Sequence, residues 1–277
     1  MRAADGAWAE VHLNGAHVTS WRPASDGAER LFLSARSEFR EGRAIRGGIP
    51  VIFPQFAAEG PLPRHGFART SLWTHADRAQ ESDEEVVSSF ELTDSPKTRA
   101  IWPASFRATL TVRVGGERLA VEFAVENTGA APFAFTAALH TYLRVESVRE
   151  AELAGLHGGR YRESAAPHVL RFDNDERLRV SGEIDRVYVG APPRLTLRET
   201  RRELHLITAQ FPDVVVWNPG PEKAKALSDM EPGGDGRMLC IEAAAVQEPI
   251  ALDPERRWAA SQTLLAHARE SQATRMT

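Results

Sequence analysis

Hydrophobic and polar residues alternate along much of this chain with a period of two. The longest example covers 106–125, where apolar side chains occupy every second position from 106 to 114 and again from 119 to 125. Alternation of this kind is typical of a strand with one buried face, and the Gly115-Gly116 pair between the two runs predicts a tight turn. A second β-hairpin is predicted over 9–21, where Asn14-Gly15 separates two shorter runs.

Strand-like segments recur along the rest of the chain. Turn residues separate further strands, which we expect at 85–92, 194–198, 203–208, 214–217, 238–246 and 258–265. No segment carries a sustained apolar stripe with a 3.6-residue period, and 17 prolines and 20 glycines interrupt the chain at strand-like spacing. The pattern therefore predicts an all-β protein with little helix. We expect one antiparallel β-sandwich domain over 1–277, in which the polar residues 266–277 form a frayed tail.

Composition narrows the classes of partner. With 277 residues, of which 42% are hydrophobic and 26% charged, the chain can bury one large core. Its net charge of −4 and its pI near 6.2 provide no basic field for nucleic acid or an anionic membrane, so an anion would have to bind to a local cluster. The single cysteine, Cys240, excludes an internal disulfide. Because neither a signal sequence nor a membrane-spanning apolar run is present, we expect a cytoplasmic protein.

One stretch, AIRGGIPVIFPQFAAEGPLPRHGFART at 44–70, departs from the strand pattern. It holds four prolines and four glycines, which favour an ordered loop around the short apolar segment 51–53. The loop also carries Arg46, Arg64, His65 and Arg69. From residue types alone, this stretch fits the lip of a binding site and a surface connector with incidental charges equally well.

Two apolar strands each contain one titratable residue. His140 lies within the otherwise small and apolar segment 132–143, and it could be a core histidine bonded to a backbone carbonyl. Glu242 lies in 238–246, the most apolar strand of the chain. Burial of an unpaired carboxylate costs roughly several kcal/mol of free energy. Glu242 must therefore face a polar cavity, meet a cation or belong to a functional site.

Together the motifs IRGGIP, FPQF and HGFAR resemble the aldose 1-epimerase superfamily, and within it the glucose-6-phosphate 1-epimerase branch. The resemblance extends over about 14–265 and implies a large β-sandwich, the galactose mutarotase-like supersandwich. It also implies that His140, in LHTY, is a general acid and that Glu242, in CIEAA, is a general base. Asp185 would bind sugar hydroxyls, although an aspartate before a strand often serves a turn. His65 would bond the sugar near its ring oxygen, unless it is a histidine of the rim.

The resemblance implies interconversion of the α and β anomers of a hexose 6-phosphate, with glucose 6-phosphate as the expected substrate. A base takes the proton of the anomeric hydroxyl and an acid protonates the ring oxygen, so the ring opens and closes with no cofactor and no metal. Opposite charges would support each other, because a Glu242 carboxylate raises the pKa of His140 and an imidazolium lowers that of Glu242. We expect a monomer whose partner is a small sugar phosphate.

The phosphate would need a local counter-charge. Arg46 and Arg69 are expected to form a clamp, and Arg64, which replaces a glutamine frequent in the family, is a candidate third member. Alternatively, Arg46 pairs with an acidic neighbour such as Glu41 or Glu59 and only fastens the loop.

Other functions stay open at this stage. The chain could act on unphosphorylated sugars as a general aldose 1-epimerase, or be a sandwich protein that binds carbohydrate without turning it over. A two-carboxylate glycosidase would have to use Asp185 with Glu242 and would leave His140 without a role. Metal binding by His65, His140 and Glu242 is disfavoured, because their spacing makes no compact ligand motif.

Overall fold

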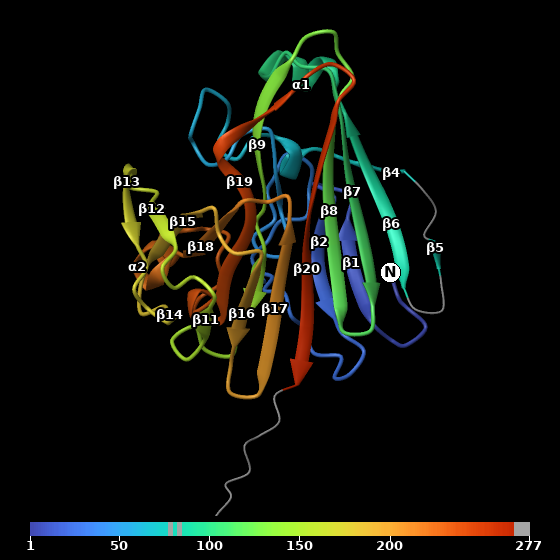
Figure 1. Ribbon diagram of the computed structural model, residues 1–277. Coiled ribbons are helices and arrows are strands. Elements are labelled where there is room, and N and C mark those ends of the chain that lie inside the picture. Colours follow the sequence, from blue (N-terminus) through green and yellow to red (C-terminus); the bar gives the residue numbers. More distant parts are fainter. Residues whose placement is uncertain (77–79, 82–84, 269–277) are drawn as a thin grey trace, which may run out of the picture.

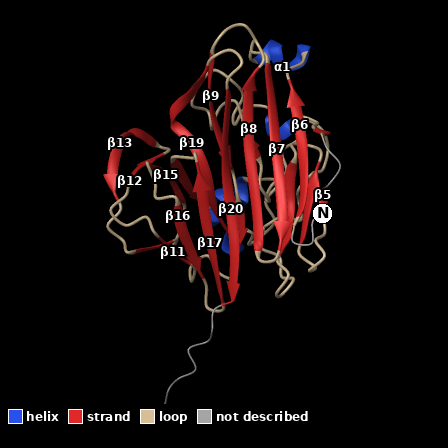
Figure 2. Ribbon diagram, turned by 45° about the vertical axis from the view of Figure 1, so that its right-hand side comes forward, coloured by secondary structure: helices blue, strands red, loops and turns tan. Residues whose placement is uncertain are grey.

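The computed structural model describes residues 1–76, 80–81 and 85–268, and these fold into two large antiparallel sheets and one hairpin (Figure 1). Strands account for 50% and helices for 7% of the residues, which confirms the predicted all-β class (Figure 2). In the described part of the chain, no helix is long and apolar enough to span a membrane.

The first sheet has ten strands, and its long central strands lie side by side in Figures 1 and 2. In spatial order its strands are β14 (Arg177–Arg179), β11 (Glu152–Ala154), β16 (Arg194–Arg198), β17 (Arg202–Ala209), β20 (Arg257–Ala268), β8 (Arg118–Asn127), β7 (Phe106–Gly115), β6 (Val86–Thr93) and β4 (Thr74–His75), with β5 (Gln80–Glu81) also beside β6.

The second sheet has eight strands. Their order is β13 (Ala166–Phe172), β12 (Arg160–Glu163), β15 (Ile184–Val189), β18 (Asp213–Asn218), β19 (Met238–Leu252), β9 (Phe133–Leu139) and β3 (Val51–Ile52), and β10 (Tyr142–Arg144) also pairs with β19. The separate hairpin consists of β1 (Trp8–His12) and β2 (His17–Arg22). The helical segments are η1 (Ala68–Thr70), α1 (Pro96–Ile101), α2 (Gly220–Ala226) and η2 (Asp235–Arg237).

Both predicted hairpins are present, with one shift at a turn. In β7–β8, Gly115 pairs with Arg118, so the two-residue turn is Gly116-Glu117 rather than Gly115-Gly116. Gly116 has a φ of 54°, which glycine adopts at little cost. β20 also extends further than predicted, because 266–268 pair with 202–204 of β17. The rest of the predicted tail, 269–277, lies outside the described residues.

The strands β11 to β15 were not predicted. They are short, and their buried positions are interrupted by arginines and glutamates, so the period-two signal is weak. At the edge strand β13 the alternation is lost altogether, since Val169, Leu170 and Phe172 are all exposed.

The core lies between the two sheets, and Phe53 joins it to the loop at 44–70. Its ring centroid lies 5.2 Å from Phe106 of β7 and 5.3 Å from Phe135 of β9. Phe53 is fully buried, so it fixes the middle of a glycine- and proline-rich stretch in the core. The charged ends of that stretch are held against the eight-stranded sheet as a result.

Alternation along β19 decides which side chains leave the core. Leu239, Ile241 and Ala243 belong to the large core cluster, whereas Cys240 and Glu242 do not. Because successive side chains of a strand point to opposite faces, Glu242 lies on the face of the eight-stranded sheet that is turned away from the inter-sheet core.

Candidate active site

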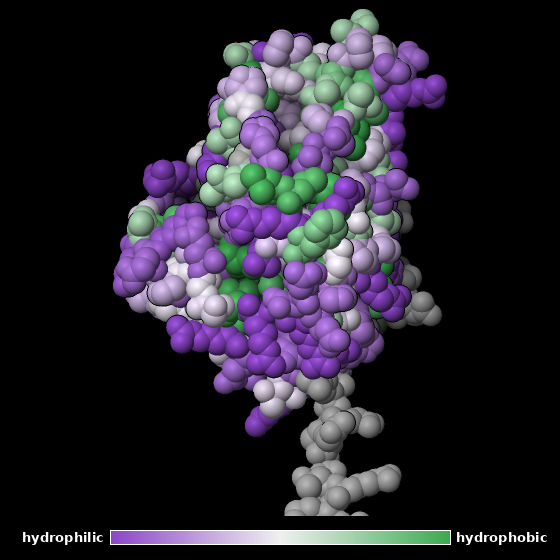
Figure 3. All heavy atoms as spheres, turned by 60° about the vertical axis from the view of Figure 1, so that its left-hand side comes forward, coloured by the Kyte–Doolittle hydropathy of each residue, from purple (hydrophilic) through white to green (hydrophobic). Residues whose placement is uncertain are grey.

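A cavity of about 1270 Å³ opens over this outer face of the eight-stranded sheet. Figure 3 views the molecule from the side of β12, β13 and α2, where hydrophilic side chains surround a hollow with hydrophobic residues at its floor. The cavity lining contains every site residue that the sequence predicted: Arg46, Arg64, His65, Arg69, His140, Asp185 and Glu242.

His140 and Glu242 meet at the floor because β9 and β10 both pair with β19. His140 lies between β9 and β10, and its backbone N–H donates to the Pro50 carbonyl at 3.0 Å. The distance from His140 Nδ1 to Glu242 Oε1 is 3.2 Å, and the two residues are 7% and 1% exposed. The histidine ring is stacked on Tyr142, with centroids 4.8 Å apart and planes within 9°.

The electrostatics of this pair differ from the expectation. Burial lowers the pKa of His140 well below its usual value, and Arg69 and Arg46 lower it further. Burial raises the pKa of Glu242 well above its usual value, and Asp185 adds to the effect. Desolvation therefore outweighs the mutual support of opposite charges, and the free site favours a neutral imidazole beside a protonated carboxyl.

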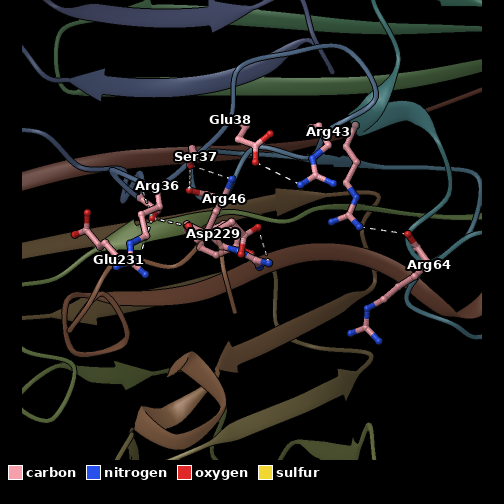
Figure 4. A network of polar contacts seen from close by, with 11 residues as sticks. Arg36, Ser37, Glu38, Arg43, Arg46, Arg64, Asp229 and Glu231 are labelled. Carbon is pink, nitrogen blue, oxygen red and sulfur yellow. Dashed lines mark hydrogen bonds and ion pairs between the residues drawn. The ribbon is translucent and has the colours of Figure 1, made fainter. Parts of the chain in front are cut away.

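Arg46 is held by a carboxylate that the sequence did not indicate. Its Nη2 lies 3.1 Å from Asp229 Oδ2, its Nε donates to Asp229 Oδ1 at 3.2 Å, and its Nη1 donates to the Tyr142 hydroxyl at 2.9 Å (Figure 4). Arg46 thus pairs with a carboxylate, as the alternative expected, but the carboxylate is Asp229 and not Glu41 or Glu59. Glu41 lies 3.7 Å from Lys97, and Glu59 pairs with Arg162. Asp229 was missed because it is 183 positions away in the chain.

Arg64 and Arg69 form a cationic wall. Arg69 Nη2 donates to the Arg64 carbonyl at 3.3 Å, which brings the two residues together. Burial lowers the pKa of Arg69 to about 10, and Arg46 and Arg64 contribute to the shift. Among the described residues, no carboxylate is in ion-pair distance of either guanidinium. This wall is therefore suited to an anion.

His65 presents a hydrogen-bond donor to the cavity. Its Nδ1 accepts from the Ala57 backbone N–H at 3.3 Å, which leaves the proton of the neutral ring on Nε2. Burial lowers its pKa, as do Arg69 and His140, so the ring stays neutral. Its centroid lies 5.6 Å from that of His140. His65 is 6% exposed, which places it deeper than a histidine of the rim.

Asp185 lies inside β15 and not at a turn, so the turn-capping alternative is wrong. The Ser164 hydroxyl donates to its Oδ1 at 2.5 Å, and burial raises its pKa. Ser164 and Tyr142 are the contacts that sequence reasoning missed here. The sequence could have indicated Tyr142, because residues two positions apart in an extended chain share a face and Tyr142 follows His140 by two.

Comparison with known proteins agrees with this geometry. The family model described as aldose 1-epimerase matches residues 1–265. A protein of Cenchrus ciliaris named "Putative glucose-6-phosphate 1-epimerase" is 34% identical, over 93% of this chain and 81% of its own length. A protein of Escherichia coli with the same name is also 34% identical, over 90% of this chain and 83% of its own.

Solved structures give the same match. The crystal structure of a "putative mutarotase" from Salmonella typhimurium superposes with a TM-score of 0.86 at 30% identity, covering 94% of this chain and 87% of that one. A GalM/aldose epimerase homologue from C. elegans shares the fold, with a TM-score of 0.72 at 12% identity over 98% of both chains.

Proposed function

Because this chain belongs to the aldose 1-epimerase family, we propose that it interconverts the α and β anomers of a hexose 6-phosphate, with glucose 6-phosphate as the first candidate. The observation that carries the proposal is a buried acid–base pair, His140 and Glu242, on the floor of a cavity whose wall holds Arg64 and Arg69. A sugar ring over the pair would direct its 6-phosphate to the arginines.

The pair can perform ring opening without gaining or losing a proton overall. Glu242 as carboxylate takes the proton of the anomeric hydroxyl while imidazolium His140 gives its proton to the ring oxygen, and the C1–O5 bond breaks to leave an aldehyde. Rotation about C1–C2 and ring closure by the reverse transfers produce the other anomer. The transfer between Oε1 and Nδ1 spans 3.2 Å and prepares the charged form from the neutral one. A dianionic phosphate nearby favours the imidazolium, because an opposite charge raises a histidine pKa.

The remaining site residues position the sugar. His65 donates from Nε2 to a sugar oxygen, and Asp185 accepts from a sugar hydroxyl with the oxygen that Ser164 does not occupy. We assign the phosphate to Arg64 and Arg69 and give Arg46 a different task, since Asp229 already neutralises it. Arg46 holds the hydroxyl of Tyr142, whose ring supports His140.

The test is anomer exchange measured by NMR on a panel of free and phosphorylated hexoses. We expect exchange of glucose 6-phosphate to be accelerated strongly over the uncatalysed reaction and that of free glucose far less. Equal acceleration of both sugars would instead make the protein a general aldose 1-epimerase. Saturable binding without acceleration of either would make it a carbohydrate-binding protein.

A further inference from the structure

The only cysteine of the chain lies beside the proposed catalytic pair. Cys240 and Glu242 are two positions apart on β19 and so share a face of the strand, and Cys240 is the register partner of Tyr142. Ligand atoms of His140, Cys240 and Glu242 all lie within 4.8 Å of one another, and all three residues are buried. The proposed reaction gives the thiol no task.

Two polar atoms of this cluster lack hydrogen bonds. Within the described part of the chain, neither His140 Nδ1 nor Glu242 Oε2 has a hydrogen-bond partner, although Nδ1 is close to Oε1. Buried polar atoms are satisfied in the great majority of cases, so two orphans in one cluster require an explanation. Each atom carries a lone pair when its group is deprotonated, and a cation is the partner that such atoms share.

We propose that His140, Cys240 and Glu242 form a site for a zinc-like divalent cation, which blocks the proposed reaction when bound. Imidazole nitrogen, thiolate and carboxylate together suit Zn²⁺, whereas Mg²⁺ and Ca²⁺ prefer oxygen ligands only. Tetrahedral Zn²⁺ places its ligand atoms about 3.3–3.7 Å apart, as follows from Zn–N, Zn–O and Zn–S distances near 2.0–2.3 Å. The His140–Glu242 separation of 3.2 Å is about 0.1 Å below the short end of this range, and the thiol has to approach by about 1 Å or less.

Zn²⁺ binds cysteine as the thiolate, so binding of the cation releases the thiol proton of Cys240. The three residues leave a fourth position free, as in zinc sites that retain an open ligand position, and His140 and Glu242 border the cavity there.

Inhibition follows from the shared ligands. A bound cation removes the lone pair of His140 and the carboxylate of Glu242 from proton transfer, so metal and sugar compete. Only this inhibition rests on the proposed function, because cation binding itself requires no turnover.

Binding is therefore tested directly on the full chain. Zn²⁺ is titrated against a chromogenic chelator, and Co²⁺ replaces it to reveal a thiolate-to-metal charge-transfer band. We expect one tight site, no competition from Mg²⁺, and a cobalt–thiolate band. In Cys240→Ala the band disappears and Zn²⁺ affinity falls at least 10-fold, since even partners in the outer shell of a metal site contribute about 10- to 100-fold. Cys240→Ser is a second variant that keeps the shape of the side chain, in case alanine disturbs the packing. We expect the same loss of the band and of Zn²⁺ affinity.

A matched control addresses adventitious binding. His205 and His267 lie side by side on the ten-stranded sheet, with ring centroids 4.7 Å apart. His205 Nε2 lies 3.3 Å from Glu203 Oε1, so this pair also combines histidine with a carboxylate. His205→Gln should bind Zn²⁺ like the parent protein. If His205→Gln loses the site, or if Cys240→Ala binds Zn²⁺ as tightly as the parent, the inference is overturned.

The activity arm separates the two proposals. Zn²⁺ should inhibit anomer exchange by the parent and by His205→Gln, chelator should reverse this, and Cys240→Ala should require at least 10-fold more Zn²⁺ for the same fractional inhibition. If the protein binds Zn²⁺ through Cys240 but turns over no sugar, the metal-site proposal stands and the proposed function is wrong. Turnover that Zn²⁺ occupancy leaves unaffected would overturn the inhibitory role.

Discussion

The catalytic proposal depends at the residue scale on two side chains that act as one unit. His140→Asn and Glu242→Gln should each remove most of the turnover of glucose 6-phosphate, because ring opening requires both proton transfers. The double variant should be little slower than either single variant, since groups that act together show strongly non-additive losses. Anomer exchange by NMR measures the rates, and circular dichroism checks the fold. If His140→Asn exchanges the anomers at nearly the parental rate, His140 is not the general acid.

Burial sets the pH dependence of the pair. The active form holds one proton on two groups. Because the pKa of His140 is lowered and that of Glu242 is raised, a second proton binds only at more acidic pH and the single proton leaves only at more alkaline pH than for exposed groups. We expect the acid limb of kcat/KM to lie below about 6.5, the usual histidine value.

This profile is best measured with free hexose and a chelator. A sugar phosphate titrates near pH 6, as phosphate monoesters do, and would add a limb of its own. An acid limb that begins above pH 7 would contradict the neutral, buried imidazole.

The cationic wall gives a prediction about substrate choice. Arg69→Ala and Arg64→Ala should each lower kcat/KM for the phosphorylated sugar by about 10- to 150-fold, equivalent to about 1.5–3 kcal/mol for one charge-assisted contact. The exchange of free hexose should be almost unchanged. Arg43→Ala is the matched control, because Arg43 is exposed, directly precedes the loop at 44–70 and lies 3.4 Å from Glu38 (Figure 4). Equal losses of kcat/KM with both sugars would mean that Arg64 and Arg69 do not bind the phosphate.

At the scale of elements, one ion pair fastens the loop at 44–70 to the eight-stranded sheet. Arg162 of β12 donates to both carboxylate oxygens of Glu59 at 2.9 and 2.8 Å, and its Nε donates to Gln247 of β19 at 3.0 Å. Arg162 is 3% exposed, so loss of its partner would leave a buried charge uncompensated.

Glu59→Gln should therefore destabilise the protein by about 1–3 kcal/mol and raise KM, because the same loop carries Arg64 and His65. Urea unfolding and NMR exchange measure the two effects. Glu183→Gln is the control, since it removes the more exposed pair with Lys223, also at the cavity, and should change stability by less than about 1 kcal/mol. If both variants behave alike, Arg162–Glu59 has no special part in holding the loop.

At the scale of the whole molecule, buried histidines couple the stability of the fold to pH. His17 of β2 is fully buried, and its Nε2 lies 2.7 Å from the Gly47 carbonyl. Burial lowers its pKa to about 4. Between pH 6.5 and 4 the unfolded chain thus binds more protons than the folded one, so stability is full above about 6.5 and falls as the pH falls.

Acidification from pH 7 to pH 5 should cost about 2 kcal/mol through His17 alone. His17→Gln, which retains a donor for Gly47, should show a pH dependence weaker by that amount in urea unfolding at the two pH values. An unchanged slope would mean that His17 is not held neutral in the folded state.

The sequence by itself determined the class of fold and predicted residues that the structure places around one cavity. Period-two alternation and two-residue turns are local properties, so β7, β8 and most long strands followed from them, while short charged strands such as β12 did not. His140 and Glu242 stood out because a polar residue in an apolar strand is visible without coordinates, and the loop at 44–70 supplied Arg46, Arg64, His65 and Arg69.

Only the tertiary structure decided what these residues face. The pairing of Arg46 with Asp229, the stack of Tyr142 on His140 and the approach of Cys240 join side chains through sheet register and loop packing, which no local pattern encodes. The protonation of the pair was decided in the same way. Desolvation is the sum over all atoms that exclude water from a group, and here that sum outweighed the attraction between two neighbouring charges. Arg69 and Arg46 add to the shift at His140, and Asp185 adds to the shift at Glu242.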